Sequence, residues 1–239
     1  MNTYFQFKQF TVHQENCAMK VCTDACLFGA WLSTIIAADK IPLNGLDIGT
    51  GTGLLSLMLA QQTPISIDAI EMDQAAYLQA TSNVELSNWS TQIQVYLQRL
   101  QDFYPDKKYD LIFSNPPFFN NDLQSADAHK NMAKHEITLT TQVLFESVDR
   151  LIVEEGRFAV LIPFHRRENY INTAEQFNLY VEEEMQVKQS HTHSFFRSLL
   201  LFSKTKIAEP TTMEMSIKDA NNQYTEIFTG YLKPYYFYL

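Results

Sequence analysis

Gly45-Leu-Asp-Ile-Gly49-Thr-Gly-Thr-Gly53 is the stretch that decides the fold of this chain. Its first residues, Leu46-Asp47-Ile48, predict a short buried strand, and its alternating glycines predict a tight turn. The apolar run over residues 54–61 then predicts a helix. Glycine has no Cβ, so a turn built from it lets the backbone approach a ligand closely. Strand, glycine turn and helix in this order indicate an α/β sheet that binds a ligand at one edge.

Strands and helices alternate along the rest of the chain. Further strands are predicted at 65–70, 93–97, 111–113, 156–162, about 181–187 and about 196–202. Helices are predicted at about 74–86, 141–151 and 168–177. This alternation predicts an α/β fold with a doubly wound, mostly parallel, Rossmann-like sheet of seven strands. In such sheets ligands bind beyond the carboxyl ends of the strands.

The N-terminal segment has a different pattern. Apolar and polar residues alternate over 4–12, which predicts a strand or hairpin. Thr23-Asp24 then predicts the start of a helix that runs to about Ala38. We expect residues 1–239 to form a single domain, with 1–38 as an N-terminal strand and helix extension packed on its core.

The composition is that of a soluble globular protein, with 46% hydrophobic and 19% charged residues. No apolar run approaches the roughly 18 residues that span a bilayer, and the N-terminus lacks a signal-peptide pattern. We therefore predict a cytoplasmic protein with no membrane contact, in which Cys17, Cys22 and Cys26 are reduced. His191 and His193 have no third ligand nearby in the sequence, so no metal site is predicted.

The net charge of −9 argues against nonspecific binding to nucleic acid, which requires a basic surface. It leaves room for a local basic patch. Candidate RNA contacts are the basic residues Lys8, Lys20, Lys130, Lys134, Arg166, Arg167, Lys188 and Arg197.

Four candidate positions follow four successive predicted strands. They are the glycine turn, Glu71, Asp102 and Asn115. Because the carboxyl ends of parallel strands meet at one edge of a sheet, we expect these positions to lie along one rim. Asp73 is a competing carboxylate next to Glu71, but its place before a predicted helix favours a capping role.

The glycine spacing favours S-adenosylmethionine over a nicotinamide dinucleotide. The dinucleotide turn is G-x-G-x-x-G, whereas this chain has G-x-G-x-G preceded by Asp47. A carboxylate there repels a phosphate but can accept the ammonium group of an amino acid. Glu71 is then placed to accept hydrogen bonds from the ribose hydroxyls, and Asp102 to accept one from the amino group of the cofactor's adenine.

Asn115-Pro116-Pro117-Phe118 ends the strand predicted at 111–113. Proline fixes φ and has no amide N–H, so the two prolines stop the strand. The Asn115 side chain and the carbonyl of Pro116 are then two fixed acceptors beside an aromatic ring. Such a group suits a flat base with an amino group, as in adenine. The same residues also open ordinary loops, because asparagine and proline favour turns.

With these motifs in place, the chain resembles the class I S-adenosylmethionine-dependent methyltransferases with an N-P-P-aromatic motif. Segments near the N-terminus narrow the resemblance to bacterial transfer-RNA adenine-N6 methyltransferases, which act on the adenine 3′ of the anticodon in a valine tRNA. These segments are Phe7-Lys-Gln-Phe10, Cys17-Ala-Met-Lys-Val21 with Thr23-Asp24, and Gly29-Ala-Trp31.

The resemblance implies S-adenosylmethionine as cofactor and tRNA as substrate. It also implies a set of site residues. The catalytic ones are Asn115, Pro116, Pro117 and Phe118, and the cofactor-binding ones are Lys20, Thr23, Asp47, Gly49, Thr50, Gly51, Gly53, Glu71, Met72, Asp102 and Asn115. No obligate protein partner is implied.

The chain departs from that family in three ways. Cys22 and Ala25 stand where the family tends to have glycine, Phe118 stands where it usually has tyrosine, and the chain is acidic rather than basic. Alternative functions are methylation of a ribosomal RNA adenine or of a glutamine amide in a protein. A cofactor-binding protein without turnover and a nicotinamide oxidoreductase are more distant alternatives.

Overall fold

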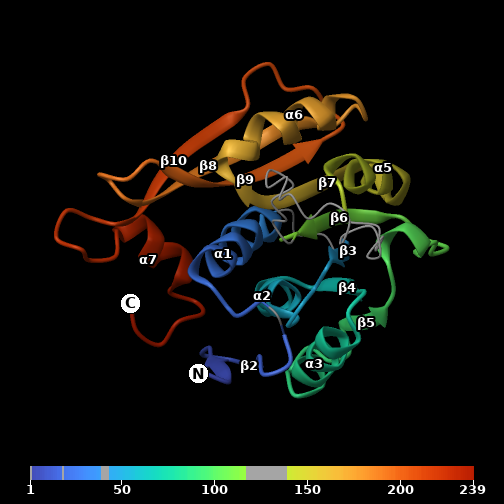
Figure 1. The fold of residues 1–239 in the computed structure, drawn as a ribbon, viewed down its shortest axis with the longest axis horizontal. Coiled ribbons are helices and arrows are strands. Elements are labelled where there is room, and N and C mark those ends of the chain that lie inside the picture. The colour runs from blue at the N-terminus through green and yellow to red at the C-terminus, as the bar shows by residue number, and fades with distance from the viewer. Residues whose placement is uncertain (1, 18, 39–42, 117–138) are drawn as a thin grey trace, which may run out of the picture.

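The computed structural model describes residues 2–17, 19–38, 43–116 and 139–239. Its centre is an eight-stranded sheet in the order β10-β8-β9-β7-β6-β3-β4-β5 (Figure 1). The strands from β5 to β7 are parallel, and β9 is antiparallel to both of its neighbours. The strands are β3 (Leu43–Ile48), β4 (Ile65–Glu71), β5 (Ile93–Leu97), β6 (Tyr109–Ser114), β7 (Ile152–Pro163), β8 (Tyr180–Ser190), β9 (Phe195–Ser203) and β10 (Thr211–Lys218).

Helices cover both faces of the sheet. One face carries α1 (Thr23–Ala37), α2 (Leu54–Gln62), α3 (Gln74–Glu85) and α7 (Glu226–Leu232), around a core that includes Leu27, Met58 and Phe228. The other face carries α5 (Thr141–Leu151) and α6 (Arg167–Glu175), around a core that includes Phe145, Phe158 and Phe202. The side chains in these two layers are almost wholly removed from water, which is the main source of stability for such a sheet.

The doubly wound, mostly parallel fold class is confirmed, but the sheet has eight strands rather than the seven predicted. The additional strand is β10, which pairs in parallel with β8 at the edge of the sheet. Its first four residues are exposed and only Met215 and Ile217 are buried, so its apolar pattern is too weak to indicate a strand. Helix α7 is short and was not predicted either.

The N-terminal hairpin is present as a two-stranded antiparallel sheet of β1 (Tyr4–Gln6) and β2 (Thr11–His13). The segment after it crosses α3. Asn83, which is buried on α3, accepts from the amide N–H of His13 (3.0 Å) and donates to the carbonyl of Thr52 in the glycine turn (2.9 Å). This residue therefore ties the N-terminal segment to the edge of the sheet where the glycine turn lies.

The C-terminal end packs on the same layer. Tyr235 is buried, and its hydroxyl donates to Ser33 Oγ (3.0 Å) and to the carbonyl of Met58 (3.1 Å). Among the described helices, none is long and apolar enough to cross a membrane.

Candidate active site

The glycine turn joins β3 to α2 at the carboxyl edge of the sheet. Gly49, Gly51 and Gly53 have φ of 70°, 58° and 80°, a region that residues with a Cβ rarely adopt. The amide groups of Gly49 and Thr50 donate to the carbonyl of Ile70 at 2.9 and 3.1 Å, which fixes the turn against β4. A Cβ built on Gly49 or Gly51 would meet no atom of the described residues within 4 Å. The backbone here therefore borders open space that a ligand can enter.

Gly51→Ala is expected to weaken cofactor binding more than it destabilises the fold. A side chain at a positive φ costs about 1–2 kcal/mol, and its Cβ would project into the open space beside the turn. Gly230→Ala in α7 is the matched control, since no atom lies within 4 Å there and its φ is not positive. Calorimetric titration with S-adenosylmethionine and urea unfolding of both variants measure the two effects. Equal cofactor affinity in wild type and Gly51→Ala would contradict this assignment of the turn.

Asp47 is the penultimate residue of β3, just before the turn, and it is completely buried. Its Oδ2 atom accepts hydrogen bonds from Thr50 Oγ1 and from Ser56 Oγ, both at 2.7 Å. Its Oδ1 atom is buried without a hydrogen-bond partner among the residues that the structure describes. Burial raises the pKa of this carboxyl from 3.8 to about 6, although the bonds from Thr50 and Ser56 lower it. One oxygen of Asp47 thus holds the turn, and the other has no hydrogen-bond partner within the described residues.

Ser56 is a site residue that the sequence interpretation missed. It is fully buried, and its hydroxyl helps to orient Asp47. The available signal was a single hydroxyl among the apolar residues of α2.

Glu71 ends β4 and is also almost fully buried. Its Oε2 atom accepts from the amide N–H of Gly51 (2.9 Å), and its Oε1 atom accepts from those of Met72 (2.9 Å) and Asp73 (3.0 Å). Asp73 itself accepts from the amide of Ala76 (2.8 Å), so the capping role that competed with ligand binding is confirmed. Glu71 and the glycine turn are therefore in direct contact, as the predicted rim requires.

Lys20 lies on the N-terminal segment, where its ammonium donates to the carbonyl of Gln14. The pKa of the neighbouring thiol of Cys17 shows which charges lie close to Lys20. Burial, and then the charge of Glu71, raise the pKa of the Cys17 thiol to about 11, while Lys20 lowers it. Lys20 and Glu71 thus lie within electrostatic range of the same thiol. Thr23, in contrast, is exposed at the start of α1, where it borders a separate hollow.

Asp102 lies in the 3-10 turn Leu100–Asp102 that follows β5, and it is exposed. The loop that carries it is attached to β4, because the amide of Gln98 donates to the carbonyl of Glu71 (2.8 Å). Asp102 borders a hollow of about 530 Å³ beside the aromatic rings of Tyr96 and Phe103. The same hollow is lined by Asp68 and Lys107, which form an ion pair of 2.8 Å, so it extends along the loop that leads into β6.

Asn115 follows β6 directly. Ser114 is in register with Ile48 of β3, and its hydroxyl donates to the Ile48 carbonyl (2.8 Å). Asn115 is therefore the neighbour of Gly49, at roughly the 5 Å spacing of adjacent strands. The Oδ1 atom of Asn115 is buried and has no hydrogen-bond partner within the described ranges. Pro116 is buried, whereas Pro117 and Phe118 lie outside the described residues.

Several candidate RNA contacts already have partners in the fold. Lys8 donates to the carbonyl of Lys233 (2.6 Å), and Lys188 pairs with Glu214 (3.2 Å). Arg167 forms two bonds of 2.7 Å with Glu184, whose side chain is fully buried. Burial alone would raise the pKa of Glu184, but the bonds from Arg167 and Ser198 outweigh it, so the pKa is lowered. Lys130 and Lys134 lie outside the described residues.

Arg167→Met is expected to reduce stability by about 3–5 kcal/mol, because it leaves a buried carboxylate without its counter-charge. The tRNA affinity of the protein that stays folded should change little. Urea unfolding at pH 7.5 measures the first effect, and filter binding to tRNA measures the second. A variant with unchanged stability and weakened RNA binding would instead favour Arg167 as an RNA contact.

Known proteins are similar to this chain in both sequence and fold. Residues 31–171 match the model of the methyltransferase small domain family. A tRNA1(Val) (adenine(37)-N6)-methyltransferase from Parabacteroides distasonis is 40% identical over 237 residues, which cover 98% of each chain. The protein of the same name from Pectobacterium carotovorum is 37% identical, over 98% of this chain and 94% of its own.

Solved structures with low identity share the fold alone. A predicted O-methyltransferase from Agrobacterium tumefaciens superposes with a TM-score of 0.66 at 16% identity, over 88% of this chain and 96% of its own. A ribosomal protein methylase from Lactobacillus delbrueckii superposes with a TM-score of 0.58 at 16% identity, over 82% and 84%. The family model matches residues 31–171, and the relatives are 37–40% identical over nearly the full length of the chain. This chain therefore belongs to the methyltransferase small domain family and, within it, to the tRNA1(Val) (adenine(37)-N6)-methyltransferases.

Proposed function

We propose that this protein methylates N6 of an adenine in tRNA, at the position next to the anticodon of a valine tRNA, with S-adenosylmethionine as methyl donor. The observation that carries the proposal is the Oδ1 atom of Asn115 beside the glycine turn, which is buried and has no hydrogen-bond partner among the described residues. The names of the full-length relatives support the choice of tRNA and of adenine N6.

The residues at the rim fit this cofactor. Gly49 and Gly51 border open space, and the free Oδ1 atom of Asp47 is suited to the ammonium of an amino acid. Glu71 presents its carboxylate next to the turn, and Asp102 is exposed at the far end of the same edge. When bound, the cofactor supplies a methyl group on a positively charged sulfur, which is open to attack by a nucleophile.

The task of the protein is to make the adenine amino group reactive. Its nitrogen is a poor nucleophile because the lone pair is delocalised into the ring. Asn115 Oδ1 and the carbonyl of Pro116 can each accept one N6–H, which favours a pyramidal nitrogen with its lone pair directed away from both acceptors. Their dipoles also stabilise the positive charge that grows on nitrogen, and fixed alignment supplies much of the rate enhancement.

This chemistry requires no strong general base, since the methylated ammonium is acidic and loses its proton readily afterwards. It does require access to the base. An adenine in a folded RNA must leave its stack to reach a site at the edge of the sheet.

The proposal is tested by methyl transfer from labelled S-adenosylmethionine to bulk tRNA from cells that lack this protein, followed by nucleoside analysis. We expect label in N6-methyladenosine, in the anticodon fragment of a valine tRNA. Label in ribosomal RNA or in methylglutamine would retain the amino-group chemistry and contradict the substrate. A bound cofactor without transfer to any of these would favour a binding protein over an enzyme.

A further inference from the structure

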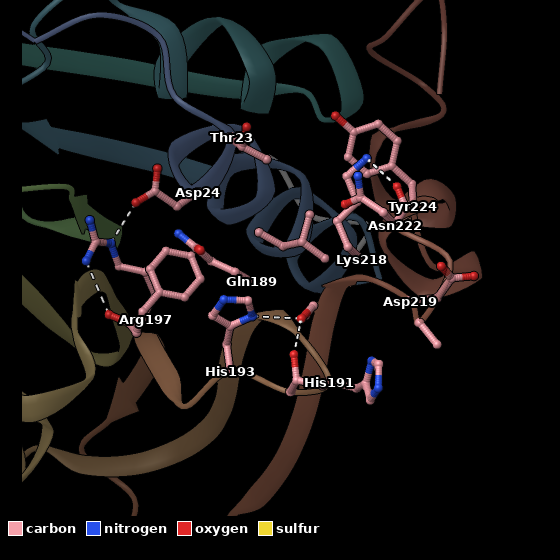
Figure 2. A pocket seen from close by; sticks show the side chains of 15 residues that line it. Thr23, Asp24, Gln189, His191, His193, Arg197, Lys218, Asp219, Asn222 and Tyr224 are labelled. Atoms are coloured by element: carbon pink, nitrogen blue, oxygen red, sulfur yellow. Dashed lines mark hydrogen bonds and ion pairs between the residues drawn. The ribbon is translucent and has the colours of Figure 1, made fainter.

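A second hollow lies on the same edge of the sheet, beyond the ends of β8 and β10 (Figure 2). It has a volume of about 740 Å³, and we call it the rim hollow. It lies between the turn that joins β8 to β9, the loop that joins β10 to α7, and the start of α1. Its charged and polar lining includes Asp24, His193, Arg197, Lys218 and Asp219.

Strand register places the rim hollow near Asn115. Ser114 of β6 pairs with Val160 of β7, and three residues further along β7 Pro163 pairs with Arg197 of β9. Arg197 thus lies two strands away from Asn115 across the sheet, and about two residues closer to the edge formed by the carboxyl ends of the strands. Ordinary strand spacing and rise make this separation roughly 10–15 Å. A nucleotide chain with one base at Asn115 could therefore place adjoining nucleotides in the rim hollow.

The acidic groups of the rim hollow have partners within the protein. Asp24 Oδ2 accepts from Arg197 Nε at 2.6 Å, as Figure 2 shows. Asp219 Oδ1 accepts from the amide groups of Asn221 (2.8 Å) and Gln223 (2.9 Å). The ion pair neutralises Asp24, and the two amide groups stabilise the carboxylate of Asp219 without cancelling its charge, so the rim hollow repels an anion less than two unpaired carboxylates would.

Lys218 is the basic group of the rim hollow that is not tied to a carboxylate. Its ammonium lies 3.7 Å from the centre of the Tyr224 ring and donates to the carbonyl of Asn222 (3.2 Å). Tyr224 is in turn stacked on Phe228, with ring centres 4.8 Å apart. Among the residues that the structure describes, Lys218 has no carboxylate partner. The ring therefore positions a cation that keeps its full charge for a ligand.

The β8–β9 turn adds an imidazole and two hydroxyl groups that can form hydrogen bonds to a nucleotide. His193 Nδ1 lies 2.7 Å from Ser190 Oγ, which lies 3.0 Å from Thr192 Oγ1. These bonds fix the turn, as Figure 2 shows for His193. Next to it, Phe196 is half-buried and lines the hollow. A cation, hydroxyl groups and an aromatic ring along one groove are the components of a site for single-stranded nucleic acid.

We propose that the rim hollow binds the backbone of the tRNA nucleotides next to the methylated adenine, with Lys218 at a phosphate. This inference rests on the proposed function. It explains how a chain of net charge −9 holds an anionic substrate. On this surface the charge of Asp24 is neutralised by Arg197, and Lys218 has no carboxylate partner among the residues that the structure describes.

The test compares Lys218→Glu with the matched control Lys206→Glu. The ammonium of Lys206 also lies over a tyrosine ring, 5.2 Å from the centre of Tyr180, but past the end of β9 at the opposite edge of the sheet. Dissociation constants for tRNA are measured at several salt concentrations, together with cofactor affinity and melting temperature. For Lys218→Glu we expect binding about tenfold weaker at 0.15 M salt, with the slope of log K against log salt reduced by about one. Lys206→Glu should bind within about twofold of wild type, since it lies outside the proposed RNA path.

Two further variants separate a lost contact from a damaged fold. Lys218→Arg keeps the charge and should restore tRNA binding, whereas Lys218→Gln removes it and should reproduce the lower salt slope. Unchanged tRNA binding in folded Lys218→Gln and Lys218→Glu would overturn the inference while leaving the proposed function intact. Failure of the wild-type protein to methylate tRNA would instead overturn the proposed function itself.

Discussion

Asn115→Ala is expected to lower the rate of methyl transfer to tRNA by about a thousandfold while S-adenosylmethionine still binds. Loss of one fixed dipole aimed at developing charge typically costs a factor of about 10² to 10³. Here the same side chain also orients the lone pair of the attacking nitrogen, so the upper end of that range applies. Cofactor affinity should hold because Asp47, Glu71 and the glycine turn are held by bonds that do not involve Asn115.

Single-turnover kinetics with saturating tRNA measure the first effect, and calorimetric titration measures cofactor affinity. Asn44→Ala is the matched control. Asn44 is exposed near the amino end of β3, where its side chain donates to Asp110 Oδ2 (3.3 Å), and it should retain turnover. A variant at Asn115 that turns over at the wild-type rate would remove the role assigned to this carboxamide.

The sequence was most informative where a local pattern determines the backbone. Positive φ at Gly49, Gly51 and Gly53 follows from the absence of a Cβ, and the cap at Asp73 follows from its place before an apolar helix. Once the strands are parallel, the alignment of Glu71 and Asn115 at one edge follows from topology alone.

Contacts between distant residues could not be predicted in this way. The ion pair of Asp24 with Arg197 joins the start of α1 to β9, and no local pattern indicates it. Arg167 resembled a free basic residue because its partner Glu184 lies on another element. The rim hollow depends on β10, an edge strand with little apolar alternation, so Lys218 was not among the candidate RNA contacts.

Asp47→Asn is expected to have opposite effects on stability and on cofactor binding. Burial raises the pKa of Asp47 from 3.8 to about 6, so the folded protein holds this proton more tightly than the unfolded chain does. The stability that this group contributes is fully present below pH 3.8 and is lost as the pH rises through about 6. Asparagine cannot ionise. Relative to wild type, the variant should therefore gain about 2 kcal/mol of unfolding free energy between pH 4 and pH 7.5.

Its affinity for S-adenosylmethionine should fall by about 10- to 100-fold, since the ammonium of the cofactor loses a charged acceptor. Urea unfolding at both pH values and calorimetric titration at pH 7.5 measure the two changes. Ser56→Ala is the control, because it removes one hydrogen bond to Asp47 Oδ2 and keeps the charge. It should reduce stability by about 2 kcal/mol and weaken cofactor binding less than Asp47→Asn does. If Asp47→Asn bound the cofactor as tightly as wild type, the cofactor would not require the charge of Asp47. The side chain would then serve only to hold the turn, and its buried charge would destabilise the fold without contributing to binding.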